Sequence, residues 1–285
     1  MRRIEQPGPV DPLRIESHSA PLVAGRIDLQ PGDLLMDAVA KNLAGLGLRS
    51  AALDLSGLTL GPLHFVIPAV SATTEHVAFY SETHRRPGPV LIDDGAATYG
   101  SREGAPFLHG HLFWRERDGR QSGGHVLPAE SRIAAAGSIG FKGCREIAMS
   151  ARFDPETNFT LFGPVVETAS APRGEASLIV AKIRPNEDLI GAIEEICRRH
   201  GVTKARLGGL IGSLVGARFE DGVAIESLPT EILGLDGSVE RRADGGYDVD
   251  LELALIDDAG KVYRGRPRRG ENPVLICIEL FLERC

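Results

Sequence analysis

The sequence predicts an α+β protein made of two similar domains, each a mostly antiparallel sheet with one main helix. The first observation is that a strand, a capping acid, an amphipathic helix and a terminal glycine occur in that order twice, once after residue 21 and once after residue 178. The second is that a hairpin pattern at 106–131 returns at 248–267. The third is the length of 285 residues, which is comfortable for two domains that each bury a core. Together these features indicate an internal duplication.

The elements of the first half follow from periodicity and turn residues. A strand is expected from Pro21, and Asp33 is expected to cap a helix that ends at Gly45 and Gly47. Alternation and β-branching then predict strands at 48–55, 64–69, 76–80 and 90–92, the hairpin at 106–131, closing strands within 133–149 and a last strand near 160.

The stretch GPVVETASAPRGEAS at 163–177 is the best candidate linker, because it is rich in small residues and proline. It separates a first domain at 18–165 from a second at 176–285, and residues 1–17 form an arm. In the second domain Asp188 stands where Asp33 stood, and Arg198 and Arg199 lie in the last turn of the helix, where the helix dipole favours cations.

Composition limits the class of protein. The net charge of −7 and the pI near 5.7 oppose long-range attraction to a phosphate backbone, so DNA binding would need a local basic patch. The four cysteines are scattered without paired spacing and no secretory segment opens the chain, which favours a reducing cytoplasm. No apolar run reaches the length of a membrane span.

The strongest chemical signal is the stretch PFLHGHLFWRERDGRQSGGHVLP. His109 and His111 are two residues apart on a predicted strand, so they point to the same face, and the turn at Asp118-Gly119 returns the chain to His125. Three neutral imidazoles without a fourth protein ligand are the composition of an open zinc site, although nickel and iron also suit imidazole. Chance occurrence of H-x-H is the competing interpretation.

The hairpin carries a geometric prediction. A plain two-residue turn at Asp118-Gly119 would place His125 opposite Leu112, on the wrong face. A shared metal therefore requires an irregularity between Gly119 and Gly124, either a bulge or a three-residue turn with Gly119 in the left-handed region, that brings His125 opposite His111.

These residues resemble a known family. HGHLFW, then DG, then GGHVLP resembles the motif of the plants and prokaryotes conserved (PPC or DUF296) domain. The resemblance implies a compact α+β fold related to acetolactate decarboxylase, which holds a catalytic zinc on three histidines. It also implies assembly into homo-oligomers, with trimers expected, and an association with DNA-binding segments in plants.

The second hairpin departs from this motif. Matching the turn glycines Gly119 and Gly260 places Asp250 at His109, Glu252 at His111 and Arg266 at His125. No set of zinc ligands survives. The acidic row could hold Mg²⁺, but a buried or half-buried ion pair with Arg266 is favoured, which makes the second domain structural or regulatory.

One segment of the second half points toward DNA. Arg264, Gly265, Arg266 and Pro267 form R-G-R-P, the core of a segment that enters narrow A·T minor grooves. Its position on a predicted strand and the acidic total disfavour this function.

Other side chains are weaker candidates. His64, His76 and His84 could supply a fourth ligand, and Arg85-Arg86 could hold a substrate carboxylate, although all are more typical of exposed positions. The sequence thus favours a metal-binding protein whose open site could serve lyase or hydrolase chemistry on a small oxo-acid, with no catalytic residue identified. The alternative is a non-enzymatic DNA-binding or assembly protein.

Overall fold

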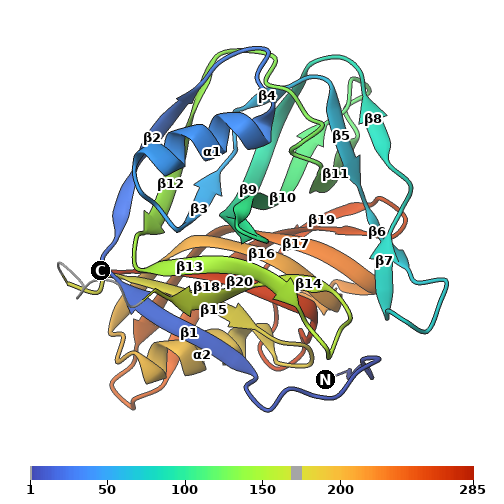
Figure 1. The fold of residues 1–285 in the computed structure, drawn as a ribbon. Helices are drawn as coiled ribbons and strands as arrows, with labels where there is room; N and C mark the ends of the chain where they lie inside the picture. Colours follow the sequence, from blue (N-terminus) through green and yellow to red (C-terminus); the bar gives the residue numbers. More distant parts are fainter. Residues whose placement is uncertain (1, 168–174) are drawn as a thin grey trace.

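The computed structural model describes residues 2–167 and 175–285, which form two large antiparallel sheets with one helix on each (Figure 1). The first sheet has eleven strands. Eight of them are neighbours in the order β2 (Val23–Leu29), β12 (Gly137–Cys144), β3 (Ser50–Asp54), β9 (Val90–Arg102), β10 (Ala105–Arg115), β11 (Gln121–Val126), β5 (Leu63–Val66) and β8 (His84–Arg86). The other three join at β9: β13 (Ile147–Phe153) and β4 (Thr59–Leu60) pair with β9, and β14 (Thr160–Val166) pairs with β13. A seven-stranded sheet runs β1 (Ile15–Ala20), β15 (Leu178–Ile183), β20 (Val274–Arg284), β16 (Lys204–Arg218), β17 (Ala224–Arg241), β18 (Tyr247–Asp257) and β19 (Val262–Gly265). A small sheet pairs β6 (Pro68–Val70) with β7 (Ala78–Tyr80). The predicted mostly antiparallel α+β class is confirmed, and β13 with β9 is a parallel pair.

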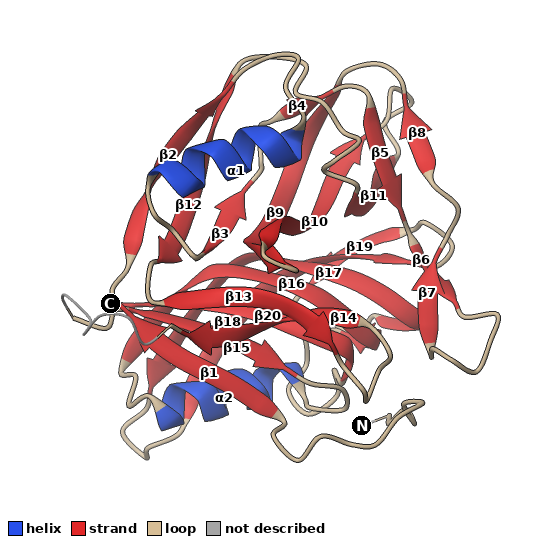
Figure 2. Ribbon diagram, viewed as in Figure 1, coloured by secondary structure: helices blue, strands red, loops and turns tan. Residues whose placement is uncertain are grey.

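The two helices lie on opposite outer faces, and the two sheets meet between them (Figures 1 and 2). Helix α1 (Leu35–Gly45) packs its apolar face on the first sheet, and α2 (Leu189–Arg199) does so on the second. Where the sheets meet, Phe113 packs against Ile211, Leu233 and Ile256. Side chains of one strand therefore alternate between a helix-covered core and a layer between the sheets.

The helix starts differ from each other. Asp188 caps α2 as predicted, because its carboxylate Oδ2 accepts a hydrogen bond of 2.9 Å from the backbone N–H of Gly191. The predicted cap by Asp33 is wrong. Leu34 occupies that position in α1, and the first free N–H groups, at Leu35 and Met36, donate instead to carbonyl oxygens of Ser131 and Pro128. The tertiary fold thus supplies acceptors that a side-chain cap would otherwise provide.

The N-terminal segment pairs with the second half of the chain. Strand β1 pairs with β15, so it belongs to the sheet of the second half. Upstream of it, the Gln6 side-chain amide donates to the Leu275 carbonyl at 2.7 Å. The arm is ordered by contact with the second half. The domain bounds 18–165 and 176–285 remain a prediction.

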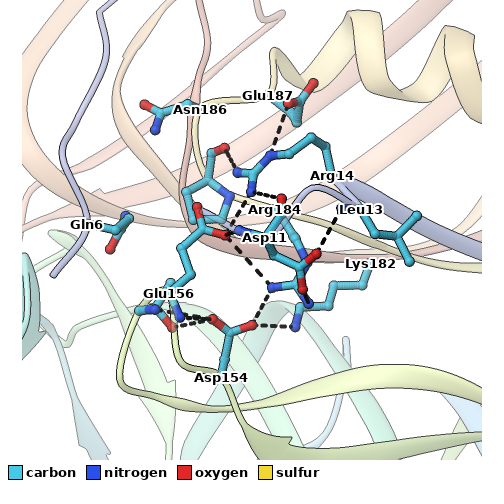
Figure 3. Close-up of polar contacts among 12 residues, drawn as sticks. Gln6, Asp11, Leu13, Arg14, Asp154, Glu156, Lys182, Arg184, Asn186 and Glu187 are labelled. Carbon is cyan, nitrogen blue, oxygen red and sulfur yellow. Dashed lines mark hydrogen bonds and ion pairs between the residues drawn. The ribbon is translucent and has the colours of Figure 1, made fainter. Parts of the chain in front are cut away.

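A buried polar network fastens the two halves together (Figure 3). Asp154, in the loop after β13, forms ion pairs with Lys182 of β15 and with Arg184, the residue after that strand, and Arg184 also contacts Glu16 of β1 at 3.0 Å. The predicted linker begins too early, because residues 163–166 belong to β14, and its residues 168–174 lie outside the described part.

Candidate metal centre

The β10–β11 hairpin has the register that a shared metal requires. His111 lies opposite His125, as predicted. The cause is a three-residue turn: the Glu116 N–H donates to the Arg120 carbonyl at 2.8 Å, and Gly119 has a φ of +84°. This left-handed conformation suits glycine, which has no Cβ to clash.

The three predicted imidazoles come together in the layer between the sheets. His109, His111 and His125 each offer a nitrogen, and these nitrogens lie within 4.8 Å of one another. The Nε2 atoms of His109 and His111 are 3.2 Å apart. Two ligands of a tetrahedral zinc, each about 2.05 Å from the metal, would be about 3.3 Å apart. The spacing of this pair is therefore that of adjacent zinc ligands.

The outer nitrogens of two of these histidines are fixed by the second sheet. His109 Nδ1 donates to Glu279 Oε1 at 2.8 Å, and His111 Nδ1 donates to the Ile232 carbonyl at 2.8 Å. With a proton on each Nδ1, the Nε2 lone pairs face each other. Their repulsion is relieved only by a positive charge between them, either a proton or a metal ion. Such carboxylate and carbonyl partners are the usual outer shell of metal-bound histidines.

A second carboxylate lies against the same cluster. Glu231 Oε1 is 3.6 Å from His111 Nε2 and 3.6 Å from His125 Nδ1. Glu231 and Glu279 are 5% and 2% exposed, and among the described residues Oε2 of each and Nδ1 of His125 have no hydrogen-bond partner. Buried carboxylates with free oxygens are costly unless a cation compensates them. The cluster is therefore short of positive charge.

The pKa values of the cluster residues reflect this shortage of positive charge. Burial lowers the pKa of His111 to about 3, although Glu231 opposes the effect, so this imidazole is neutral near pH 7. Burial also lowers the pKa of His109, but the Glu279 carboxylate outweighs burial and raises the pKa overall. Burial raises the pKa of Glu231, yet the three neighbouring imidazoles together outweigh burial and lower it. Glu231 is thus held as a carboxylate.

Sequence reasoning missed both glutamates, which the second half contributes to the histidine cluster. Each interrupts an apolar strand, in TEILGL and in CIELFL. Alternation places Glu231 on the face of Leu233, and Glu279 on the face of Phe281, and neither Leu233 nor Phe281 belongs to the core that α2 covers. An acid at an otherwise apolar strand position was the signal that could have identified them.

A cavity of about 420 Å³ opens from the cluster. Its wall contains the three histidines, Glu231, Glu279, Arg102, residues of the β6–β7 hairpin and the aromatic residues of 159–162. The Tyr80 ring lies 5.0 Å from the His125 ring, edge to face. A ligand in this cavity would reach the imidazoles directly.

The weaker candidates do not belong to the three-histidine cluster. His64 Nδ1 contacts the Glu130 carbonyl at 2.9 Å, His84 stacks on Phe65, and neither belongs to the three-histidine cluster of the described residues. His76 lines the cavity and contacts the Asn158 carbonyl at 3.3 Å. Arg86 pairs with Glu116 at 2.9 Å, so it is not free for a substrate.

The second hairpin repeats the backbone geometry of the first without its ligands. The Asp257 N–H donates to the Lys261 carbonyl and the Gly260 N–H to Asp257, as Glu116, Arg120 and Gly119 do in the first turn. Arg266 pairs with Asp250, as predicted, and the two side chains are 53% and 56% exposed, so the pair is not buried but about half exposed. An open strand edge there lets water solvate both charges.

The R-G-R-P segment is part of the folded structure. Arg264 forms an ion pair with Asp94, Gly265 pairs with Leu253 in the β18–β19 ladder, and Pro267 is buried. Its arginines are neutralised by acidic partners, and its backbone is not a free tail.

No helix in the described part of the chain is long and apolar enough to cross a membrane.

Comparison with known proteins supports part of the sequence interpretation. The model of the Plants and Prokaryotes Conserved (PCC) domain family matches residues 171–285, the half that supplies Glu231 and Glu279. The matched residues do not include the three histidines. No curated protein matches the chain.

Among solved structures, a metal-containing protein from Archaeoglobus fulgidus is 19% identical, with a TM-score of 0.38 over 52% of this chain and 96% of that one. A PPC protein from Pyrococcus horikoshii is 13% identical, with a TM-score of 0.38 over 53% of this chain and 96% of that one. A protein from Ralstonia eutropha described as a candidate DNA-binding protein is 17% identical, with a TM-score of 0.33 over 48% of this chain and 89% of that one.

Proposed function

We propose that His109, His111 and His125 bind one divalent transition metal ion, with zinc the best fit, and that the cavity beside it serves lyase or hydrolase chemistry on a small organic acid such as an oxo-acid. One observation carries the proposal. Three convergent imidazoles, one buried and two partly buried, lie beside two buried carboxylates that lack a compensating cation, and two of the imidazoles have their outer nitrogens fixed. A divalent ion supplies the missing charge.

The three nitrogen donors favour some metals over others. Imidazole nitrogens suit zinc, nickel and iron, whereas Mg²⁺ and Ca²⁺ prefer oxygen ligands. When bound, such an ion polarises a carbonyl oxygen or lowers the pKa of a water molecule. Three protein nitrogens leave a coordination position for a substrate or water, so the composition is that of a catalytic site rather than a closed structural one.

The two glutamates have distinct roles in the proposal. Glu279 orients His109 through its hydrogen bond to Nδ1, which leaves Nε2 free for the metal. Glu231 faces the cavity with an unpartnered Oε2, so it can accept a proton from a bound reactant. The active centre is therefore shared between the halves.

Glu279→Gln should weaken zinc binding by about tenfold, because glutamine keeps an acceptor for His109 but removes its negative charge. Competition with a chromogenic chelator measures the affinity. Glu283→Gln on the same strand is the matched control, since Glu283 pairs with Lys142 at 2.7 Å and does not line the cavity. Equal zinc affinity in wild type and Glu279→Gln would refute the positioning role, provided that both metal-free proteins have the same melting temperature.

Assembly and ancestry are parts of the proposal that rest on resemblance. A homo-oligomer, with a trimer expected, is tested by light scattering on dilution, and a monomer at all concentrations would contradict it. The likeness to acetolactate decarboxylase also rests on resemblance. The duplication rests on the repeated sequence pattern, and the matching turn hydrogen bonds of the two hairpins support it.

DNA binding is the alternative that the contacts of R-G-R-P disfavour. We expect little or no binding to A·T-rich duplex at physiological salt, because Arg264 and Arg266 are paired with acids. A mobility-shift titration at several salt concentrations measures this. Tight binding that the double variant Arg264→Ala, Arg266→Ala abolishes would establish the alternative instead.

A further inference from the structure

The face of the first sheet that looks into the cavity carries an ordered row of side chains. On β10, His111, His109 and Phe107 alternate onto this face. On the neighbouring β9, Gly100 lies opposite Phe107 and Arg102 lies opposite Ala105, two residues farther along. Since paired residues share a face, the row runs from the histidines past Phe107 to Arg102.

The middle of the row is aromatic. A Cβ at Gly100 would lie 2.1 Å from the Met149 carbonyl oxygen and 2.6 Å from Phe162 Cε1, so the absent side chain lets Phe162 approach. The rings of Phe107 and Phe162 are 5.4 Å apart, and both line the cavity, as do Phe79 and Phe159. This wall favours an apolar or aromatic body.

The end of the row is cationic. The Arg102 guanidinium lies 5.8 Å from the centre of the Phe107 ring, and no ion pair neutralises it among residues 2–167 and 175–285. Of the described residues that line the cavity, Arg102 alone carries a permanent positive charge. An unpaired arginine beside an aromatic wall is suited to bind a carboxylate with two hydrogen bonds.

The formal charges of the groups around the cavity indicate the net charge of the ligand. A divalent ion is balanced by the carboxylates of Glu231 and Glu279, since neutral imidazoles contribute nothing. The positive charge of Arg102 is then left over, so a ligand with one negative charge completes the balance. Phe107 and His109 are two residues apart, which is about 7 Å along a strand. Arg102 lies beside Phe107, and the metal would lie beside His109. The anionic group and the metal-binding group must therefore sit at opposite ends of the ligand.

We propose that the cavity takes an organic monoanion with an apolar, ring-sized body, whose oxygen donor faces the histidines and whose carboxylate pairs with Arg102. This inference rests on the proposed metal site. It names Arg102 as the residue that selects for the anionic end.

Two hydroxamates that differ only at the far end test the assignment. Benzohydroxamate anchors on a metal through its oxygens, and 4-carboxybenzohydroxamate adds a carboxylate across the ring. In calorimetric titrations of the zinc-loaded full chain, we expect the carboxylated probe to bind about tenfold more tightly, as charged hydrogen bonds typically do. Arg102→Gln should remove this advantage. Arg206→Gln, an exposed arginine outside the cavity, should retain it.

The outcomes separate the inference from its premise. If both probes bind zinc-loaded protein equally, or if Arg102→Gln keeps the advantage, the selection by Arg102 is wrong while the metal site stands. If the chain takes up no zinc, or if neither probe needs zinc to bind, the proposed function is wrong and the inference falls with it.

Discussion

Replacing His125 by alanine should reduce the metal content of the purified protein from about one ion per chain to none. His125 completes the set of three imidazoles, and an open site cannot hold its ion well with two. Elemental analysis of protein purified without added metal measures the content. His109→Ala should have the same effect.

His64→Ala is the matched control, because His64 lies in the same half of the chain but outside the cluster, with its Nδ1 on the Glu130 carbonyl. It should retain the full content of metal. Residual metal in a double variant, His109→Ala with His125→Ala, would place the ion elsewhere and overturn the assignment. Zinc bound by Asp250, Glu252 and Arg266 would likewise overturn the alignment of the two hairpins.

The hairpin and its three histidines could be predicted because residues close in the sequence determine their conformation. Strand alternation places His109 and His111 on one face. His125 can share that face only if the turn is irregular, and Gly119 in the left-handed conformation provides such a turn. The cap at Asp188 is equally local. Asp33 precedes its helix in the same way, but the first N–H groups of that helix donate to the carbonyl oxygens of Ser131 and Pro128. These residues are far away in the sequence, and they take the place of a side-chain cap.

The remainder of the site depended on packing between the halves. Glu231 and Glu279 are more than 100 residues from the histidines, and nothing in their spacing reveals the approach of the two sheets. The pairing of β1 with β15 is non-local in the same way, since either half could have recruited that strand. Treating the halves as independent domains therefore concealed the shared centre.

Asp154→Asn should destabilise the protein by about 3–5 kcal/mol, the usual cost of leaving a buried cation without its partner. Asp154 is 3% exposed, and its carboxylate contacts Lys182 Nζ at 3.2 Å and Arg184 (Figure 3). Its other oxygen accepts from the backbone N–H groups of Glu156 and Thr157, at 3.1 Å each. Arg184 retains Glu16, but the side chain of Lys182 is 5% exposed and would lose its charge partner. Urea unfolding measures the difference.

The effect should depend on pH in a defined direction. Burial raises the pKa of Asp154, but Lys182 and Arg184 outweigh burial and hold it below the ordinary value of 3.8. A carboxyl group whose folded pKa is depressed contributes its stability above the unfolded pKa and loses it as the pH falls through the folded pKa. The difference in unfolding free energy between wild type and Asp154→Asn should therefore be full above about pH 4 and should shrink below it.

Asp250→Asn provides the comparison that isolates burial. It removes an aspartate from an ion pair with Arg266, whose two side chains are 56% and 53% exposed, so the loss should stay below about 1 kcal/mol. Both substitutions delete one carboxylate charge, beside Lys182 and Arg184 in one case and beside Arg266 in the other, but only Asp154 joins the loop after β13 to the strand β15 of the other half. If the two variants lose equal stability, the network of Figure 3 does not fasten the halves together.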